Sequence, residues 1–157
     1  MAANRTIVVR GRGIRKEAIA GGAITPGHLV KRNTSNQYVV HPTASGNASK
    51  TFAVENEVVG LGIETAYAAN DTCLVEAVQS GSEINALVAA SASAIVIGDA
   101  VESAGNGTVR KHTPLAVNEG GSADLGSVYT DNIVGYALEA VDNSGGGSAV
   151  RLLIEIA

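Results

Sequence analysis

The sequence predicts an all-β protein: a small β-barrel or β-sandwich built from two pseudo-repeats of β-hairpins, with little helix. Short runs of Val, Ile and Leu alternate with turns rich in Gly, Asn and Ser. The 157-residue chain has 19 glycines and only 17% charged residues, a composition typical of many tight turns. One hairpin segment also occurs twice. The order of the hairpins is consistent with both a barrel and a sandwich.

The internal repeat is clearest in a hairpin of the first half, Gly-His-Leu-Val-Lys at 27–31 followed by Tyr-Val-Val-His at 38–41. Its counterpart begins 71 residues later, with Gly-Asp-Ala-Val-Glu at 98–102 and Thr-Val-Arg-Lys-His at 108–112. Two further pairs of segments are similar: 58–64 with 132–139, at an offset near 75, and 74–77 with 153–156. A segment that recurs in this way indicates a duplicated β-unit.

The repeat suggests how one compact domain is organised. The expected parts are a basic N-terminal arm (1–16), a first β-repeat (17–82) and a second β-repeat (83–157). Gly60 and Gly135 occupy the same position of the aligned repeats, so we expect a valine at either position to disturb folding in a similar way. We expect removal of residues 1–16 to leave the fold intact.

In the first half, residues 6–9 form a short β-run that glycines interrupt at 11–13. The pair Gly21-Gly22 argues against a helix in the alanine-rich stretch 17–24, because each interior glycine costs about 1 kcal/mol relative to alanine. Thr-Pro-Gly at 25–27 predicts a turn. The expected strands are then 29–32, 38–41, 51–55, 57–64 and 72–78.

In the second half, the Ala/Ser run at 89–94 could form one or two helical turns. Asn106-Gly107 is a strong signal for a hairpin turn at 104–107, and the longest loop is expected at 114–128. The expected strands are 84–88, 95–97, the two arms of this hairpin, 133–141 and 149–156.

The charge distribution along the chain is uneven. The first sixteen residues carry five basic side chains and no acid, whereas the remainder carries fifteen acids and six bases. These basic residues are Arg5, Arg10, Arg12, Arg15 and Lys16. A basic arm on an acidic body is typical of docking, and the alternative is a solvated first strand with charged flanks. Binding of nucleic acid is disfavoured, because no aromatic residues are interleaved with the basic ones.

The sequence also limits where the protein works. No apolar run approaches the ~18 residues of a membrane span, and the first residues lack the apolar core of a signal peptide. The single cysteine, Cys73, excludes an intramolecular disulfide and fits synthesis in a reducing cytoplasm. Because Cys73 lies in an expected strand, we interpret it as a buried small hydrophobe.

Candidate catalytic and metal-binding residues are few. His41 and His112 occupy matching repeat positions, each just after a strand, but no Cys, His or acid lies nearby at ligand spacing, so we expect solvated histidines and no metal. His28 aligns with Asp99, which argues against specific chemistry there.

Two pairs of acids recur in the repeat: Glu64 with Glu139, and Glu76 with Glu155. Paired carboxylates can serve acid/base catalysis, but an acid at the same strand position twice is more simply an outward-facing or edge residue. Gly-Arg-Gly at 11–13 lacks the third glycine of a nucleotide loop, and no Gly-x-Ser-x-Gly elbow is present. We therefore expect no enzyme and no cofactor.

The pattern resembles the head decoration, or capsid cement, proteins of tailed bacteriophages. The matching features are the Pro-Gly turn before Leu29-Val30, the hairpin to residues 38–40, Val-Val-Gly-Leu-Gly-Ile at 58–63, and Ile-Gly-Asp-Ala-Val at 97–101 with Asn-Gly-Thr-Val at 106–109. The low aromatic content, the chain length and the Gly-rich late loop are also similar.

The resemblance implies a β-rich homotrimer on the outside of an expanded phage capsid, made in the bacterial host cytoplasm. Such a protein bridges neighbouring subunits of the major capsid protein against the internal pressure of DNA, without touching nucleic acid or membrane. It also implies that the basic arm, Arg5 to Lys16, lies along the shell. Strand addition and pairing with capsid carboxylates would then hold it there.

Two other functions remain as alternatives. A phage surface module that recognises host carbohydrate would need exposed aromatic residues, and the whole chain has only five aromatic side chains. A small β-barrel hydrolase would have to use Glu64 and Glu139 or the histidines, and we rank it last.

Overall fold

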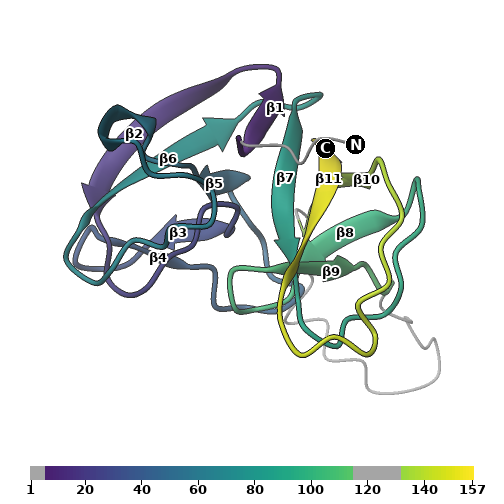
Figure 1. The fold of residues 1–157 in the computed structure, drawn as a ribbon. Helices are drawn as coiled ribbons and strands as arrows, with labels where there is room; N and C mark the ends of the chain where they lie inside the picture. The colour runs from purple at the N-terminus through teal and green to yellow at the C-terminus, as the bar shows by residue number, and fades with distance from the viewer. Residues whose placement is uncertain (1–5, 115–131) are drawn as a thin grey trace.

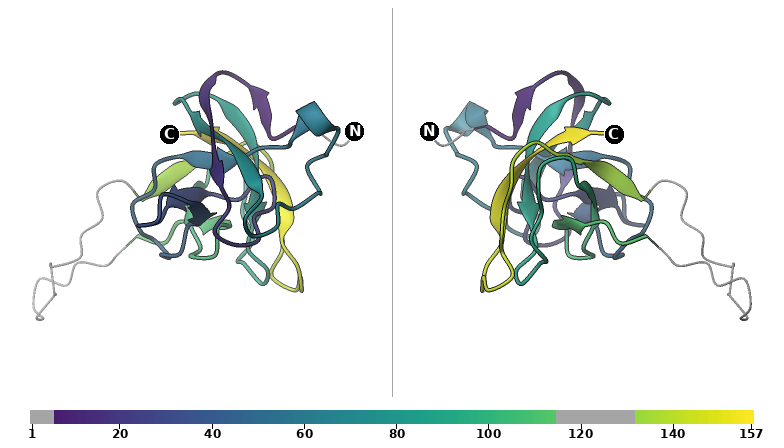
Figure 2. Two further views of the ribbon diagram at one scale, coloured as in Figure 1. Left: turned by 90° about the vertical axis from the view of Figure 1, so that its left-hand side faces the viewer. Right: turned by 90° about the vertical axis from the view of Figure 1, so that its right-hand side faces the viewer.

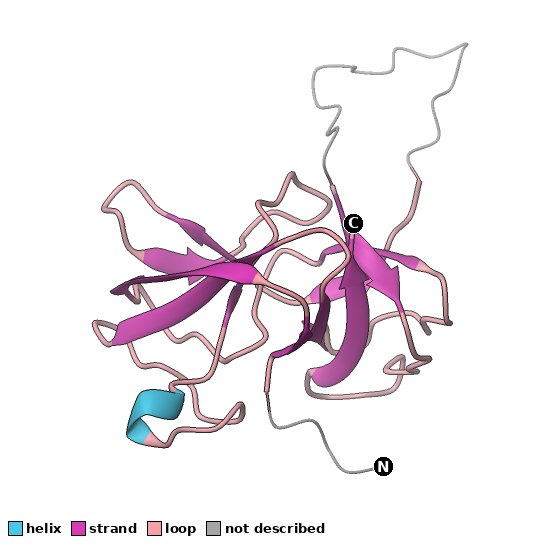
Figure 3. Cartoon of the chain, turned by 90° about the horizontal axis from the view of Figure 1, so that it is seen from above, coloured by secondary structure: helices cyan, strands magenta, loops and turns pink. Residues whose placement is uncertain are grey.

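The computed structural model describes residues 6–114 and 132–157. These residues form eleven β-strands and one short 3-10 helix, η1, which confirms the predicted all-β class (Figures 1 and 3). In chain order the elements are β1 (Val8–Arg10), β2 (Gly13–Ile19), β3 (Val30–Arg32), β4 (Tyr38–Val40), β5 (Thr51–Ala53), η1 (Glu57–Val59), β6 (Thr72–Val78), β7 (Glu83–Val88), β8 (Ala100–Ser103), β9 (Val109–Lys111), β10 (Ile133–Ala137) and β11 (Val150–Ile156).

The second half of the chain forms a closed barrel of five strands, which we call barrel 2. Its strands are ordered β7-β11-β10-β8-β9, and a parallel pairing of β9 with β7 at Val109 and Val88 closes the ring. The other neighbours in the ring are antiparallel. Of the two expected architectures, the barrel is therefore the correct one. β1 adds to the outer edge of β7, with Val8 opposite Ile84.

The first half forms a second ring in the same order, which we call barrel 1. β2, β6 and β5 form one sheet, and β3 pairs with β4. Isolated bridges close the ring: Leu29, just before β3, pairs with Phe52, and Ala20, just after β2, pairs in parallel with Tyr38. The order β2-β6-β5-β3-β4 thus matches the order of barrel 2, and the two rings form the two lobes of Figure 1.

Backbone hydrogen bonds show that the two rings are equivalent in detail. Several bonds of barrel 1 have a partner in barrel 2 with nearly the same length. The bond from Gly27 N to Ala53 O (2.8 Å) matches the bond from Gly98 N to Ala137 O (2.8 Å). The bond from Ala53 N to His28 O (2.9 Å) matches that from Ala137 N to Asp99 O (2.9 Å). The bond from His41 N to Leu29 O (2.9 Å) matches that from His112 N to Ala100 O (2.8 Å). The hairpin offset of 71 residues expected from the sequence is therefore present in space.

The alignment of residues 58–64 with 132–139 is wrong. β10 pairs with β11 and β8, and the segment of barrel 1 with these two kinds of neighbour is β5, 84 residues before it. The expected strand at 57–64 is instead η1 followed by a bend, because Gly60 takes a left-handed conformation (φ 76°) that ends the helix. Gly60 and Gly135 are not equivalent positions.

Each barrel has its own hydrophobic core of small aliphatic side chains. Barrel 2 encloses Ile84, Leu152 and Ile154, together with Leu29 and Phe52 from the first half. The core of barrel 1 consists of Ala20, Ile24, Val30, Tyr38, Ala53, Tyr67, Cys73 and Val75. Burial of each larger aliphatic side chain contributes about 1.5–3 kcal/mol. The shared residues join the two lobes into one body. In the turned views of Figure 2, the two lobes lie one behind the other.

Residues 6–16 belong to this body. Val8–Arg10 is a strand of the β7 sheet, and the predicted arm boundary at residue 16 falls inside β2, which pairs with β6 along its whole length. The expectation that residues 1–16 can be removed without damage to the fold is corrected accordingly, because the deletion would cut β2 in two. The residue bounds of the two predicted repeats stay a prediction.

Two other local expectations can be compared with the structure. The Ala/Ser run at 89–94 forms turns, with Ser91 at φ 55°, and no helix. The loop expected at 114–128 lies outside the described residues except for Pro114. No helix in the described part of the chain is long and apolar enough to span a membrane.

Candidate functional site

The predicted basic residues lie on three successive pieces of backbone. Arg10 ends β1, Arg12 lies in the turn to β2, and Arg15 and Lys16 lie in β2. Arg5 lies outside the described residues. The turn is held by Ser82, whose hydroxyl donates to the carbonyl of Arg12 and accepts from its N–H, both at 3.3 Å. The basic side chains therefore project from a fixed backbone.

Two of these side chains form ion pairs on the surface. Arg10 Nη1 lies 3.1 Å from Glu83 Oε1, and Arg15 Nη1 lies 2.9 Å from Glu57 Oε1. The hydrogen bond with Glu57 is the main cause that raises the pKa of Arg15 above its usual value. Exposed pairs of this kind contribute about 0–1 kcal/mol each. Arg12 and Lys16 are exposed.

Exposed apolar residues lie beside the basic ones. Val58 and Val59 of η1 are exposed, Val58 at 81%, and Ile14 is exposed in β2. The pair between Arg15 and Glu57 links η1 to β2. We call this region the β2–η1 surface, defined by Arg12, Ile14, Arg15, Lys16, Val58 and Val59. Exposed large apolar side chains near charged ones are candidates for an interaction site, here on both faces of β2.

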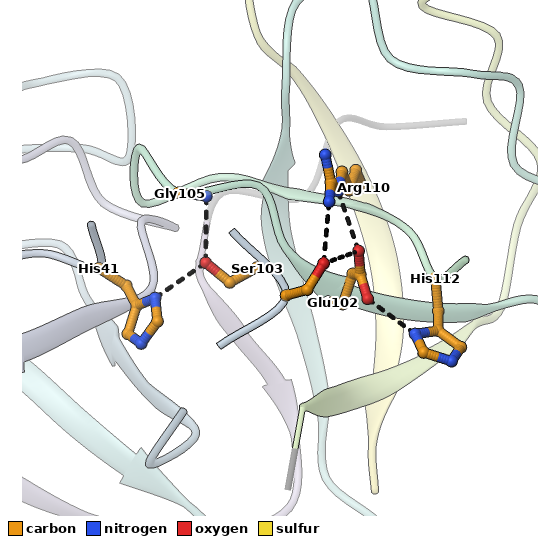
Figure 4. A network of polar contacts seen from close by, with 7 residues as sticks. His41, Glu102, Ser103, Gly105, Arg110 and His112 are labelled. Atoms are coloured by element: carbon orange, nitrogen blue, oxygen red, sulfur yellow. Dashed lines mark hydrogen bonds and ion pairs between the residues drawn. The ribbon is translucent and has the colours of Figure 1, made fainter. Parts of the chain in front are cut away.

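A buried polar network connects the two barrels (Figure 4). Its centre is Glu102 of β8, whose side chain is fully buried. The Ser45 hydroxyl donates to Glu102 Oε1 at 2.7 Å, Arg110 Nε donates to the same oxygen at 3.0 Å, and His112 Nδ1 lies 2.7 Å from Oε2. Because Ser45 follows β4 and the other residues belong to barrel 2, the network fastens the loop of barrel 1 to its neighbour.

The charge state of Glu102 follows from these contacts. Burial acts to raise the pKa of the carboxyl, but the hydrogen bonds from Ser45, His112 and Arg110 together lower it by more. The net pKa lies below the usual range, so Glu102 is ionised at neutral pH. A buried carboxylate is tolerated only when it is paired and hydrogen-bonded in this way.

The expectation of solvated histidines at strand ends is wrong. His41 is buried, with Nδ1 2.8 Å from Ser103 Oγ and Nε2 2.9 Å from the Asn47 carbonyl. His112 contacts Glu102. His28 Nδ1 accepts the N–H of Thr25 at 3.1 Å, and burial followed by the nearby charge of Arg151 lowers the pKa of His28. His41 and His112 therefore serve as hydrogen-bonding groups between segments, and His28 serves within its own turn.

The paired acids also have separate structural roles. Glu64 contacts Arg151 Nε at 2.9 Å, whereas Glu139 Oε1 accepts the N–H of Leu153 at 2.9 Å. Glu76 and Glu155 do occupy equivalent positions, since each pairs with the matching strands of its own barrel.

The remaining side-chain chemistry gives no further site. Cys73 is buried as expected, and burial raises the pKa of its thiol to about 12. Within residues 6–114 and 132–157, no three His, Cys, Asp or Glu side chains are grouped to hold a metal ion.

The sequence analysis missed the Glu102 network, although a signal for it was present. The hairpin turn at Asn106-Gly107 places Glu102 opposite Arg110, and a cross-strand pair of opposite charges was therefore foreseeable. The contribution of Ser45 was not, because it depends on how the loop of barrel 1 packs against barrel 2.

Comparison with known proteins gives one informative result. No protein-family model and no curated protein matches the chain. Among solved structures, the chain is similar to the head fiber gp8.5 N base in bacteriophage phi29. The TM-score is 0.56 with 11% sequence identity, over 93% of this chain and 95% of that chain. The two proteins share a fold along nearly their whole lengths.

Proposed function

We propose that this protein is a structural component of a tailed-phage virion that binds the outside of the capsid and cements neighbouring subunits of the major capsid protein. The observation that carries the proposal is the shared fold with the head fiber N base of phage phi29, which extends over 93% of this chain. The resemblance of the sequence to capsid decoration proteins points to the same place in the virion. Neither argument involves catalysis, a cofactor, nucleic acid or a membrane.

The β2–η1 surface is the best candidate for the capsid contact. β2 is the edge strand of its sheet, so its outer backbone groups near the start of the strand, at residues 13–15, can pair with an extended segment of another protein. Arg12 and Lys16 offer charge for capsid carboxylates, and Arg10 extends the basic region. Ile14, Val58 and Val59 supply apolar area that association can remove from water.

A cement must also transmit force between the subunits that it joins. The buried Glu102 network and the shared core residues fix barrel 1 against barrel 2, so a load on one lobe reaches the other without a hinge. A homotrimer would then multiply weak single contacts into stable attachment.

Recognition of host carbohydrate has less support. Sugar-binding sites commonly use exposed aromatic faces, yet of the four aromatic side chains in the described residues, Tyr38, Phe52 and Tyr67 are buried and only Tyr136 is exposed.

The proposal is tested by co-sedimentation of the purified protein with expanded heads of the phage that encodes it, stripped of this protein. We expect saturable binding, and Arg12→Glu with Lys16→Glu should weaken it about tenfold or more. The control is Ser148→Glu with Ala149→Glu, which adds negative charge at two exposed positions of barrel 2 just before β11 and should bind normally. Absence of wild-type binding would refute the proposal, and equal binding by both double variants would refute the assignment of the surface.

A further inference from the structure

One tight turn of barrel 1 also contributes to the junction between the two barrels. The carbonyl of Gly27 accepts the N–H of Leu87 at 3.2 Å, and the carbonyl of Pro26 accepts Arg151 Nη1 at 3.2 Å. A Cβ atom on Gly27 would lie 2.9 Å from the carbonyl oxygen of Asn85. The turn at residues 25–28 is therefore seated closely on the outer edge of β7.

Barrel 2 contains the same turn at residues 96–99. Asp99 N donates to Val96 O at 3.1 Å, as His28 N donates to Thr25 O at 3.0 Å. The side chain at the fourth position accepts the first N–H in both turns: Asp99 Oδ2 from Val96 at 2.9 Å, and His28 Nδ1 from Thr25 at 3.1 Å. Gly98 and Gly27 have φ values of 88° and 93°.

The surroundings of the two turns differ. The barrel 1 turn is packed, whereas a Cβ atom on Gly98 would meet nothing within 4 Å. Val96 and Ile97 at the tip are both exposed, Ile97 at 69%. An exposed turn that carries two large aliphatic side chains lacks the cover that its counterpart has inside the molecule.

Barrel 1 carries the matching edge. The strand registers place Ile19 of β2 where barrel 2 has Leu87 of β7, and Glu17 where it has Asn85. Leu87 is 8% exposed beneath the barrel 1 turn, whereas Ile19 is 41% exposed.

The backbone of β2 also faces outward at these positions. Antiparallel strands exchange hydrogen bonds at alternate residues, and Ala20 bonds toward β6 through Asp71 at 2.8 Å. The N–H groups of Glu17 and Ile19 therefore point to the opposite edge, where Gly21 N donates to Tyr38 O at 2.7 Å. In the described part of the chain, no strand pairs with β2 on this edge beside Glu17 and Ile19.

We propose that the turn at 96–99 of one copy docks on the β2 edge at Ile19 of a second copy, and so repeats between molecules the junction that joins the barrels within one. The Ile19 N–H would donate to the Gly98 carbonyl, and Val96 and Ile97 would cover Ile19. The contact is head to tail, so it produces a ring if the rotation closes. Three copies would form a ring of six barrels, which matches the trimer of the proposed function.

Charge favours this occupant over direct pairing of two β2 edges. Two-fold antiparallel pairing would place Arg15, Lys16 or Glu17 opposite its own copy, and like charges directly opposite are destabilising. The head-to-tail contact avoids this, because Glu17 meets a turn whose Asp99 is already paired with Lys111 at 2.7 Å. Arg151, which donates to the turn at Pro26 within the molecule, has Thr72 as its counterpart in barrel 1. The contact between copies lacks this hydrogen bond and should therefore be weaker than the internal junction.

The test is the mass of the protein in solution, measured by light scattering across a range of concentrations. Wild type should associate with rising concentration, and Ile97→Asp and Ile19→Asp should each weaken association about tenfold or more. The matched control is Leu61→Asp, which has the same 41% exposure as Ile19 but belongs neither to the turn at 96–99 nor to the β2–η1 surface, and it should behave as wild type. Thermal unfolding of all variants verifies that they are folded.

A mixture of the two variants makes the test specific. Ile97→Asp retains an intact edge and Ile19→Asp an intact turn, so the mixture should form one-to-one dimers that grow no further. A two-fold contact would give no such complementation. A wild-type protein that stays monomeric, or an Ile97→Asp variant that associates normally, would overturn the inference.

Only the trimer on the capsid rests on the proposed function, and its failure can be recognised separately. If the association is correct but capsid binding is not, wild type forms rings that do not sediment with heads. If capsid binding is correct but the association is not, wild type sediments with heads and the two variants bind as well as wild type does.

Discussion

Barrel 1 and barrel 2 share one ring order and one set of backbone hydrogen bonds, yet they close in different ways. In barrel 2 every neighbour in the ring is paired through named strands, whereas isolated bridges at Leu29 and Ala20 complete barrel 1. The two rings therefore share their turns and backbone bonds throughout, whereas their core side chains are identical at some positions, such as Val30 and Val101, and differ at others. Cys73 and Leu152, for example, fill the same position of the two rings.

The two barrels also differ in what covers their edges. The outer edge of β7 is covered by β1 and by the turn at Gly27, whereas the equivalent edge of β2 is open in the described residues. The surfaces assigned to the capsid and to a second copy both lie where barrel 1 lacks the cover that barrel 2 has.

The largest effect should come from two glycines that look equivalent in the sequence. A Cβ atom on Gly135 would lie 2.3 Å from the carbonyl oxygen of Glu155, so Gly135→Ala should lower the free energy of unfolding by about 4 kcal/mol or more. Gly60 faces open space, and Gly60→Ala should cost only about 1 kcal/mol for its positive φ. Chemical denaturation measures both, and equal losses would support the alignment that the structure rejects.

A second comparison concerns the cores. Leu152→Ala should lower the free energy of unfolding by about 3 kcal/mol, because it opens a cavity at a fully buried position of barrel 2. Cys73→Ala at the matching position of barrel 1 removes one sulfur atom and should cost about 1 kcal/mol. Equal losses in the two variants would contradict the claim that Leu152 fills more of the core of barrel 2 than Cys73 fills of the core of barrel 1.

The third comparison tests the network that joins the barrels, and its main effect is smaller than those of Gly135→Ala and Leu152→Ala. Glu102→Gln should lower the free energy of unfolding by about 2 kcal/mol at pH 7, because Arg110 and His112 lose a carboxylate as their hydrogen-bonding partner. Since the pKa of Glu102 is lower in the folded state, its stabilising effect is complete above the unfolded value near 4.5 and is lost as pH falls through the folded value.

The measurement is chemical denaturation as a function of pH. The difference between wild type and Glu102→Gln should shrink as the solution is acidified. Glu57→Gln, which removes an exposed ion pair, is the control and should change stability by less than about 1 kcal/mol. A difference that stays constant with pH would contradict the ionised state of Glu102.

Hydrophobic patterning and turn residues were sufficient to predict the fold class and the hairpin repeat. Gly27 and Gly98 mark equivalent turns, and the glycines were visible in the sequence. The alignment of the later strands was not predictable, because similar sequences around Gly60 and Gly135 form different structures. Gly60 ends a 3-10 helix, whereas Gly135 lies in a strand. Spatial pairing with β6 and β11, and not sequence similarity, identifies β5 as the counterpart of β10.

The candidate site was predictable only in part. The run of basic residues up to Lys16 was evident, but its attachment to the body depends on pairing between β2 and β6, far apart in the sequence. Ile97 was predicted to lie in a strand. Its place at the exposed tip of a turn became evident only by comparison with the packed turn of barrel 1.

Electron cryo-microscopy of phage heads, with and without this protein, tests the central claim most directly. The account predicts added density on the outer surface of the shell that contacts more than one subunit of the major capsid protein, with the β2–η1 surface toward the shell. Heads whose outer surface is the same with and without the protein would contradict it.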